Sequence, residues 1–398
     1  MLKFMPILGH RILHKVLSLL FILSIFSSLL AKEMEPYRHI AAFGFNKPLS
    51  YAEVNNPSPI IAYYYFKDNL QNDLYGQFTL LTTNIYCIFG FTNEKKFAGI
   101  KPILNHTVYS AYHCYTNGVD DERRNFKGHN AGSEFFYQYY ILKNLSVKGV
   151  YFPGYYWYNK NSKTNYPLYE RQATEIDLPN KHWEHAGILE IFLNSVEKKN
   201  IDRIKHGFFI RGYYRYEYRE GYGTFKDSTQ AEDSSVNETQ KRYLKAGVYY
   251  NFPHDINLLM DFSGAYHKNI DRNNSDHIGG YISEEGVMPG YYWGEFYHNK
   301  YAITRARIGM PLFFWDARLE PGFNLLYIPK DNNVIGVGDY PRTIYRSVSA
   351  GLSLKLGGIL PFFADYTYGI DARRVNLNTG KIKRGHHEIM ALFLIAFN

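Results

Sequence analysis

The chain has 398 residues with a net charge of +8, and 18% of them are aromatic (38 Tyr and 28 Phe), although 21% are charged and the mean hydropathy is only −0.36. This aromatic content is unusual for a soluble protein but typical of a transmembrane β-barrel, which carries aromatic girdles at both membrane interfaces. The basic residues are scattered, so the charge argues against a nucleic-acid partner. Cys87 and Cys114 are too few for a disulfide-stapled fold, and one bridge or two buried thiols fit equally well.

The N-terminus has the pattern of an export signal. Arg11 and Lys15 precede the apolar run VLSLLFILSIFSSLLA, whose 16 residues are short for a membrane-spanning helix and end at Ala31. We expect residues 1–31 to be a signal peptide and residues 32–56 a short periplasmic segment. No later stretch offers 18 consecutive apolar residues, so a mature chain embedded in a membrane must form a barrel, expected over residues 57–398.

Alternation of apolar and polar residues recurs along the rest of the chain and predicts sixteen strands. They are expected near 57–66, 74–83, 84–93, 98–106, 107–116, 131–143, 145–158, 183–195, 205–219, 242–252, 255–267, 300–312, 316–328, 343–355, 358–371 and 385–397. From the sixth strand onward, short connections such as FPHD alternate with long polar ones such as 220–241 and 268–299. Short periplasmic turns and long extracellular loops alternate in this way in outer-membrane barrels, and an even strand count leaves both termini in the periplasm.

The two faces of each predicted strand differ in polarity. A lysine or arginine on the lipid face costs about 2–4 kcal/mol at the bilayer midplane, so we expect the charged face to line the lumen. The predicted lumen wall consists of Arg211, Arg215, Glu217, Lys245, Asp261, Arg305, Arg307, Arg318, Glu320, Asn324 and Asp365. The last strand carries an apolar face that includes Ile389, Phe393, Ile395 and Phe397, and we expect the barrel assembly machinery to recognise it during biogenesis.

Residues 279–312 resemble the core signature of the bacterial surface antigen family, which includes the BamA and TamA barrels. The match consists of Gly279-Gly280, then Val287 and Pro289-Gly290-Tyr291, then Gly294-Glu295, and finally Pro311-Leu312. In that family, a tetrad of Val or Ile, Arg, Gly and an aromatic lies on a long loop between strands eleven and twelve, and our independent strand count places 268–299 there. The resemblance implies that this loop folds inward, with its tip against lumen residues such as Arg305, Arg307 and Asn324.

The sequence departs from the family at two points. The tetrad arginine is replaced by Pro289, and the acidic residue that would hold it has Asn324 as its nearest counterpart, so both members of a buried charge pair are lost together. The assembly and secretion members carry periplasmic POTRA domains, for which residues 32–56 are too short. The segment IRGY at 210–213 spells the tetrad letter for letter but falls within the ninth strand, so we interpret Arg211 as a wall residue.

Catalytic and metal-binding interpretations are weaker than structural ones. His182 and His185 are three residues apart, so on a strand they point to opposite faces and cannot bind one metal. Ser263 and His267 lie about 13 Å apart by strand rise, too far to pair. His386-His387-Glu388 is most simply polarity at a membrane interface. We expect no enzyme activity, no metal and no cofactor.

The sequence therefore predicts an all-β protein of the bacterial outer membrane, an antiparallel barrel of about 16 strands with a long loop folded into the lumen. The resemblance implies a role in transport or assembly. A passive porin-like channel and a surface-exposed adhesin are the alternatives. The expected partners are outer-membrane lipid, the barrel assembly machinery during biogenesis, and a separate POTRA-bearing protein.

Overall fold

The computed structural model describes residues 39–49, 58–68, 74–81, 84–93, 95–105, 111–112, 115–116, 119–120, 125–160, 176–200, 203–227, 236–271, 273–281, 285–312, 317–329, 343–356, 360–375 and 381–397. The expected signal peptide and Cys114 lie outside these ranges, so both predictions about them stay predictions. Cys87, on the fourth strand, is a free thiol. Within the described ranges, no helix has the length and apolar character needed to cross a membrane.

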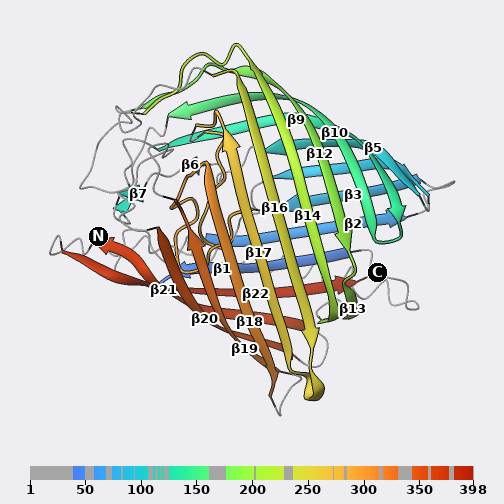
Figure 1. The fold of residues 1–398 in the computed structure, drawn as a ribbon, viewed down its shortest axis with the longest axis vertical. Helices are drawn as coiled ribbons and strands as arrows, with labels where there is room; N and C mark the ends of the chain where they lie inside the picture. Colours follow the sequence, from blue (N-terminus) through green and yellow to red (C-terminus); the bar gives the residue numbers. More distant parts are fainter. Residues whose placement is uncertain are drawn as a thin grey trace, which may run out of the picture.

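Sixteen long antiparallel strands form one sheet that closes on itself, because the first strand pairs with the second and also with the last (Figure 1). They are β1 (His39–Pro48), β2 (Ser58–Asp68), β3 (Leu74–Leu81), β4 (Ile85–Thr92), β5 (Lys96–Asn105), β9 (Phe126–Leu142), β10 (Leu145–Lys160), β12 (His182–Asn194), β14 (Arg203–Glu220), β16 (Glu238–Asn251), β17 (Asn257–Lys268), β18 (Lys300–Pro311), β19 (Arg318–Tyr327), β20 (Ile344–Leu356), β21 (Leu360–Val375) and β22 (Ile382–Phe397). The predicted barrel fold and strand number are confirmed.

Short elements are attached to this wall. β6 (Ala111–Tyr112) and β13 (Glu197–Asn200) extend it by pairing with the starts of β9 and β14. β7 (Tyr115–Thr116) pairs with β8 (Val119–Asp120), and β11 (Ile176–Asp177) pairs with β15 (Lys226–Asp227), each as a separate two-stranded ribbon. A 3₁₀ turn, η2 (Pro253–Asp255), makes the tight connection between β16 and β17.

Two points of the strand prediction need correction: the first barrel strand was not predicted, and the fifth predicted strand is not found as expected. β1 lies at His39–Pro48, ahead of the expected barrel start at residue 57, and the segment 32–56 is therefore not wholly periplasmic. Its sequence HIAAFGFNKP is rich in small residues and lacks polar alternation, which hid it. In the described part of 107–116, Ala111–Tyr112 (β6) pairs with β9 and Tyr115–Thr116 (β7) pairs with β8, so these residues do not form the single long barrel strand that was expected. The prediction lacked β1 but included 107–116, so the predicted number of barrel strands was still sixteen.

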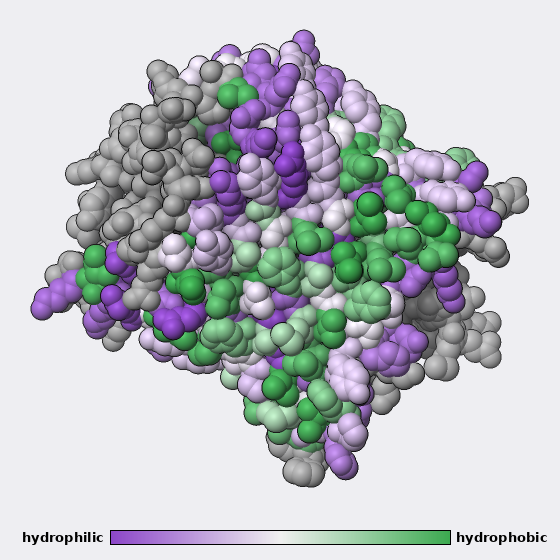
Figure 2. Space-filling view, in the orientation of Figure 1, coloured by the Kyte–Doolittle hydropathy of each residue, from purple (hydrophilic) through white to green (hydrophobic). Residues whose placement is uncertain are grey.

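The two faces of each strand separate as the alternation predicts. On β14, Phe208 and Ile210 are each 42% exposed on the outer face, whereas Glu217 and Arg219 on the inner face are 1% exposed. Figure 2 shows the resulting band of hydrophobic residues across one side of the molecule, with hydrophilic residues gathered above it. This apolar outer face suits a hydrocarbon environment, and strand pairing satisfies the backbone groups of the barrel wall.

Candidate functional site: the loop between β17 and β18 and the lumen wall

The connection between β17 and β18, residues 269–299, is a long loop that contacts the inner face of the barrel wall. β17 and β18 are the eleventh and twelfth barrel strands, as expected for this loop. The loop has no regular structure in its described part apart from two isolated bridges, Ile278 with Phe296 and Gly280 with Met288, which fold it back on itself. We call it the lumen loop, because its side chains contact residues on the inner faces of at least six strands.

Glycines make this folding sterically feasible. Gly279 and Gly280 have φ values of 124° and 66°, in the region that favours glycine. A Cβ atom on Gly279 would lie 2.0 Å from the carbonyl oxygen of Tyr292, so the two arms of the loop approach each other too closely for any side chain there. The glycine pair noted in the sequence therefore has a structural function in the turn of the lumen loop.

An apolar cluster attaches the lumen loop to the wall. From the loop, Ile278, Met288, Tyr291 and Phe296 are all at most 2% exposed. They pack against inward-facing apolar residues of β18 to β21, namely Tyr301, Ile303, Leu326, Tyr345 and Ala372. The inner wall of a water-filled channel is polar, so this apolar patch indicates that the wall packs against the loop at this place.

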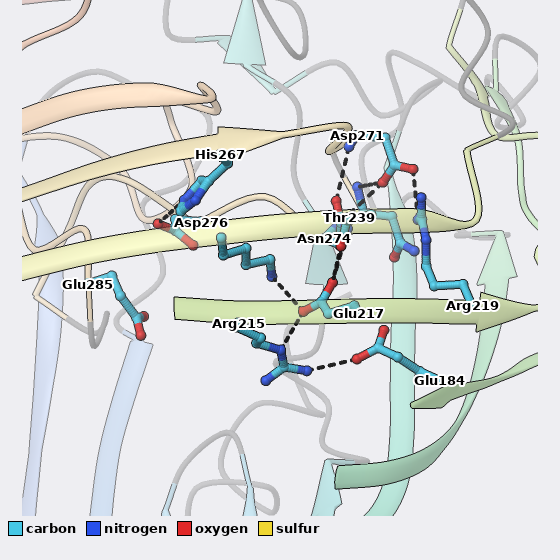
Figure 3. Close-up of polar contacts among 12 residues, drawn as sticks. Glu184, Arg215, Glu217, Arg219, Thr239, His267, Asp271, Asn274, Asp276 and Glu285 are labelled. Carbon is cyan, nitrogen blue, oxygen red and sulfur yellow. Dashed lines mark hydrogen bonds and ion pairs between the residues drawn. The ribbon is translucent and has the colours of Figure 1, made fainter. Parts of the chain in front are cut away.

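Buried charge pairs hold the first arm of the loop (Figure 3). The Arg219 guanidinium donates to the Asp271 carboxylate at 2.9 Å and lies 3.6 Å from the centroid of the Tyr222 ring. Further along, Asp276 accepts hydrogen bonds from His267 Nε2 at 2.8 Å and from the Tyr301 hydroxyl at 2.6 Å. Burial acts to raise the pKa of the Asp276 carboxyl, but His267, the charge of Lys241 and the hydrogen bond from Tyr301 together outweigh it and lower that pKa to about 2.

The tip of the loop, at Pro289-Gly290-Tyr291, rests on the last three strands. The backbone N–H of Gly290 donates to Glu388 Oε2 on β22 at 2.9 Å, and the Tyr291 hydroxyl donates to the carbonyl oxygen of Arg346 on β20 at 3.0 Å. Gly290 also packs against Gly369 of β21, where a Cβ would lie 2.0 Å from the Gly290 carbonyl oxygen. At Gly290 the tip therefore contacts the wall through backbone atoms, and this contact needs glycine on both sides.

An ion pair between the loop and β21 fixes the second arm. Glu295 of the loop accepts two hydrogen bonds from Arg374 of β21, each at 2.9 Å, and the guanidinium lies 4.0 Å from the centroid of the Tyr292 ring. The side chains of Arg374 and Glu295 are 4% and 9% exposed. This pair is distinct from the one that the family resemblance implies, which would join the tetrad position, here Pro289, to the position of Asn324 on β19.

The predicted wall residues lie on inward faces, and most of them bond neighbouring polar groups of the barrel. Four ion pairs line the wall, namely Arg211 with Glu190 at 2.8 Å, Arg215 with Glu184 at 2.7 Å, Arg305 with Asp261 at 2.8 Å, and Arg307 with Asp365. Glu217 accepts a hydrogen bond from Thr239 at 2.5 Å, Glu320 accepts one from Ser353 at 3.0 Å, and Arg318 donates to the carbonyl of Asp255 at 2.6 Å. Lys245 lies between Arg211 and Ser263 in the strand register. Arg211 thus belongs to the wall, as the position of IRGY within a strand implied.

The expected cradle for the tip differs in detail. Arg305 and Arg307 pair with wall carboxylates, and the tip instead contacts Glu388, Gly369 and the Arg346 carbonyl. Asn324, which is 1% exposed, donates to Ser347 Oγ at 3.0 Å. A Cβ on Gly290 would lie 3.1 Å from Ser347 Cβ, so Asn324 reaches the tip only through Ser347.

The remaining predicted positions are distributed between loop and last strand. Val287 is half-buried beside the tip, and Gly294 adopts a φ of 68° immediately before Glu295. On β22, Phe393 stacks on Phe43 of β1 with ring centroids 5.3 Å apart. Ile389, Ile395 and Phe397 occupy positions in register with β1, so the last strand closes the barrel.

Sequence reasoning missed Gly369, Arg374 and Glu388. Glu388 had been interpreted as interface polarity, yet it is 1% exposed and faces inward, while its neighbour His387 contacts Tyr366 on the outer face. The available signal was a carboxylate at an inward position directly before the apolar run IMALFLIAF. His182 and His185 do lie on opposite faces, with His182 stacked on Tyr156 inside and His185 bonded to Tyr151 outside. In the described ranges, no cluster of three potential metal ligands occurs.

A closed barrel of sixteen strands, apolar outside and charged inside, defines an integral multi-pass β-barrel protein of the outer membrane. No protein-family model matches the sequence, and a search of curated proteins gives no match. Among solved structures, CdiB from Acinetobacter baumannii is similar, with a TM-score of 0.55 at 10% identity over 91% of this chain and 61% of the CdiB chain.

BamA from Haemophilus ducreyi, in a structure lacking POTRA domains 1–3, is similar with a TM-score of 0.53 at 11% identity, over 90% of this chain and 71% of that one. The protein is thus a barrel of the BamA-like kind in its fold. This chain spans about three fifths of the CdiB structure, and identities this low report the fold alone.

Proposed function

We propose that this protein works in transport or assembly at the outer membrane, with the lumen loop closing the pore of its barrel. The observation that carries the proposal is the seating of the loop, which is attached at both arms and at the tip through Asp271, Asp276, Gly290 and Glu295. A barrel that only passes small solutes gains nothing from a loop so heavily bonded across its interior. The fold shared with CdiB and BamA supports the same conclusion.

In the resting state of such a barrel the loop stays bound to the wall, because the charged residues that hold it are buried. Asp271, Arg219, Glu295 and Arg374 are all less than 10% exposed, and separating either pair would leave a buried charge without its partner. Release of the loop therefore needs energy from a client, a partner or the membrane. We further propose that the partner is a separate POTRA-bearing protein, and that the barrel itself performs no catalysis.

The proposal is tested by conductance in planar bilayers. We expect the intact protein to give small or transient currents, and a variant lacking residues 282–297 to give large, steady ones, because the loop tip and its apolar contacts are removed. A deletion of 331–340, in the connection between β19 and β20, is the matched control and leaves the small currents unchanged. Large, steady currents from the intact protein that do not change on deletion of 282–297 would indicate the porin-like alternative.

A further inference from the structure

A single buried carboxylate, Glu388 on the last strand, joins two parts of the molecule that are far apart in sequence. Its Oε1 accepts a hydrogen bond from Asn46 Nδ2 of β1 at 2.6 Å, and its Oε2 accepts one from the Gly290 N–H of the lumen loop at 2.9 Å. The Glu388 side chain is 1% exposed. Both donors therefore share one acceptor group in a site with little access to water.

The first donor belongs to the seam, the line where β1 and β22 close the barrel. Ten residue pairs run from His39 opposite Phe397 to Pro48 opposite Glu388, so Glu388 lies at the end of the described seam. On the outer face, Phe43 and Phe45 are directed to lipid and are 37% and 40% exposed, while Asn46 faces inward. The Asn46–Glu388 bond thus ties the two strands together from the lumen side.

The second donor belongs to the tip of the lumen loop, and its position depends on Gly369. A Cβ on Gly369 would lie 2.0 Å from the Gly290 carbonyl oxygen, so any larger residue must push the tip away from the wall. The heavy atoms nearest to that Cβ position belong to Gly290 and to Ala372 of β21. Gly369 therefore offers a means to displace the tip without altering the seam residues.

We propose that Glu388 couples seating of the lumen loop to closure of the seam between β1 and β22. With the loop seated, the carboxyl group is shielded from water, so no water competes with Asn46 for its Oε1, and the bond is strong because hydrogen bonds strengthen in a low-dielectric site. When the tip withdraws, water solvates the carboxylate and competes with Asn46, and the seam loosens. The coupling is reciprocal, so an open seam also weakens the hold on the loop.

Hydrogen exchange of the full-length protein in lipid vesicles tests the coupling. The substitution Gly369→Ala displaces the tip, and we expect amides of 39–48 to exchange about tenfold faster than in the unsubstituted protein, a coupling of ordinary size. Amides of 285–299 also exchange faster, which verifies that the loop has moved. The matched control is Gly149→Ala, where an added Cβ meets nothing within 4 Å, and it leaves both segments unchanged.

A second substitution, Asn46→Ala, completes the test. It removes the seam donor, so we expect faster exchange in 39–48 and, by reciprocity, in 285–299. In the Asn46→Ala protein, Gly369→Ala then adds no further increase in 39–48, because the shared carboxylate no longer links the two sites. Should Gly369→Ala prevent folding, deletion of 282–297 removes the tip by another route with the same expected result. Faster loop exchange with seam exchange unchanged overturns the proposal, as does a full additional increase in the double variant.

Discussion

At the residue scale, the lumen loop is held by a small number of buried charges rather than by many surface contacts. Glu295 and Arg374 form the clearest pair, with both carboxylate oxygens bonded to the same guanidinium at 2.9 Å. A bidentate pair of this kind fixes orientation as well as distance. Its burial makes it costly to break from one side only.

Removing one member of this pair is therefore predicted to release the loop, and removing both is predicted to be much milder. Glu295→Ala leaves the Arg374 guanidinium buried without its carboxylate and costs about 3–5 kcal/mol of loop seating. The double variant Glu295→Met with Arg374→Met replaces the charges by apolar groups and restores most of that loss. Protease cleavage within 285–299 measures the fraction of unseated loop.

Arg211→Met provides the comparison for this experiment. Arg211 is 40% exposed and its pair with Glu190 lies outside the loop contacts, so we expect an effect of about 1 kcal/mol or less on stability and none on loop cleavage. If the double variant were cleaved as readily as Glu295→Ala, the pair would not be the element that holds the second arm.

At the element scale, the strands were predictable because alternation fixes which face meets lipid, and fifteen of the sixteen predicted strands coincide with barrel strands. β1 was missed because Ala41, Ala42 and Gly44 give no alternating pattern, and its strand character comes from pairing with β2 and β22. The loop location followed from topology. Its partners did not, because Arg374 and Glu388 come from strands remote in sequence, and no local pattern states which inward residue a loop will reach.

The β14 strand allows the face assignment to be tested directly. Ile210 lies on the outer face and Arg211 beside it on the inner face, opposite Leu193 and Phe192 of β12 respectively. We predict that Ile210→Arg destabilises the barrel by about 2–4 kcal/mol, the cost of an arginine on the lipid face near the bilayer midplane. Urea titrations of the protein folded into vesicles measure this loss.

The matched substitution is Phe209→Arg, which places the same new charge on the lumen face one residue away. The expected loss of stability is smaller, because the new arginine can contact water and the carboxylates of the inner wall. Equal losses for the two substitutions would mean that the face assignment of β14 is wrong.

At the scale of the whole molecule, the barrel and its loop form a closed unit whose proposed work depends on another protein. This chain covers 61% of the CdiB structure that it resembles, and the resemblance to assembly barrels motivates the proposal of a separate POTRA-bearing partner. A periplasmic partner would act on the barrel from the side where the turn between β16 and β17 and the ends of β1 and β22 are expected to lie.

We predict that affinity-tagged protein, extracted from its native membrane after mild cross-linking, recovers a protein that contains POTRA domains. Mass spectrometry of the recovered material identifies it. A second tagged outer-membrane barrel of similar size, purified in parallel, shows which proteins bind any barrel. Recovery of the same proteins by both baits would argue against a dedicated partner and favour a channel or adhesin that acts alone.

The position of the loop's anchors also has a consequence for biogenesis. The lumen loop ends at residue 299, but Arg346, Gly369, Arg374 and Glu388, which hold its tip and second arm, come later in the chain, on β20, β21 and β22. The tip and the second arm therefore cannot reach their final positions until β20, β21 and β22 are in place. A barrel in which these three strands are not yet inserted has no anchor for that part of the loop, whatever the order in which the other strands are added.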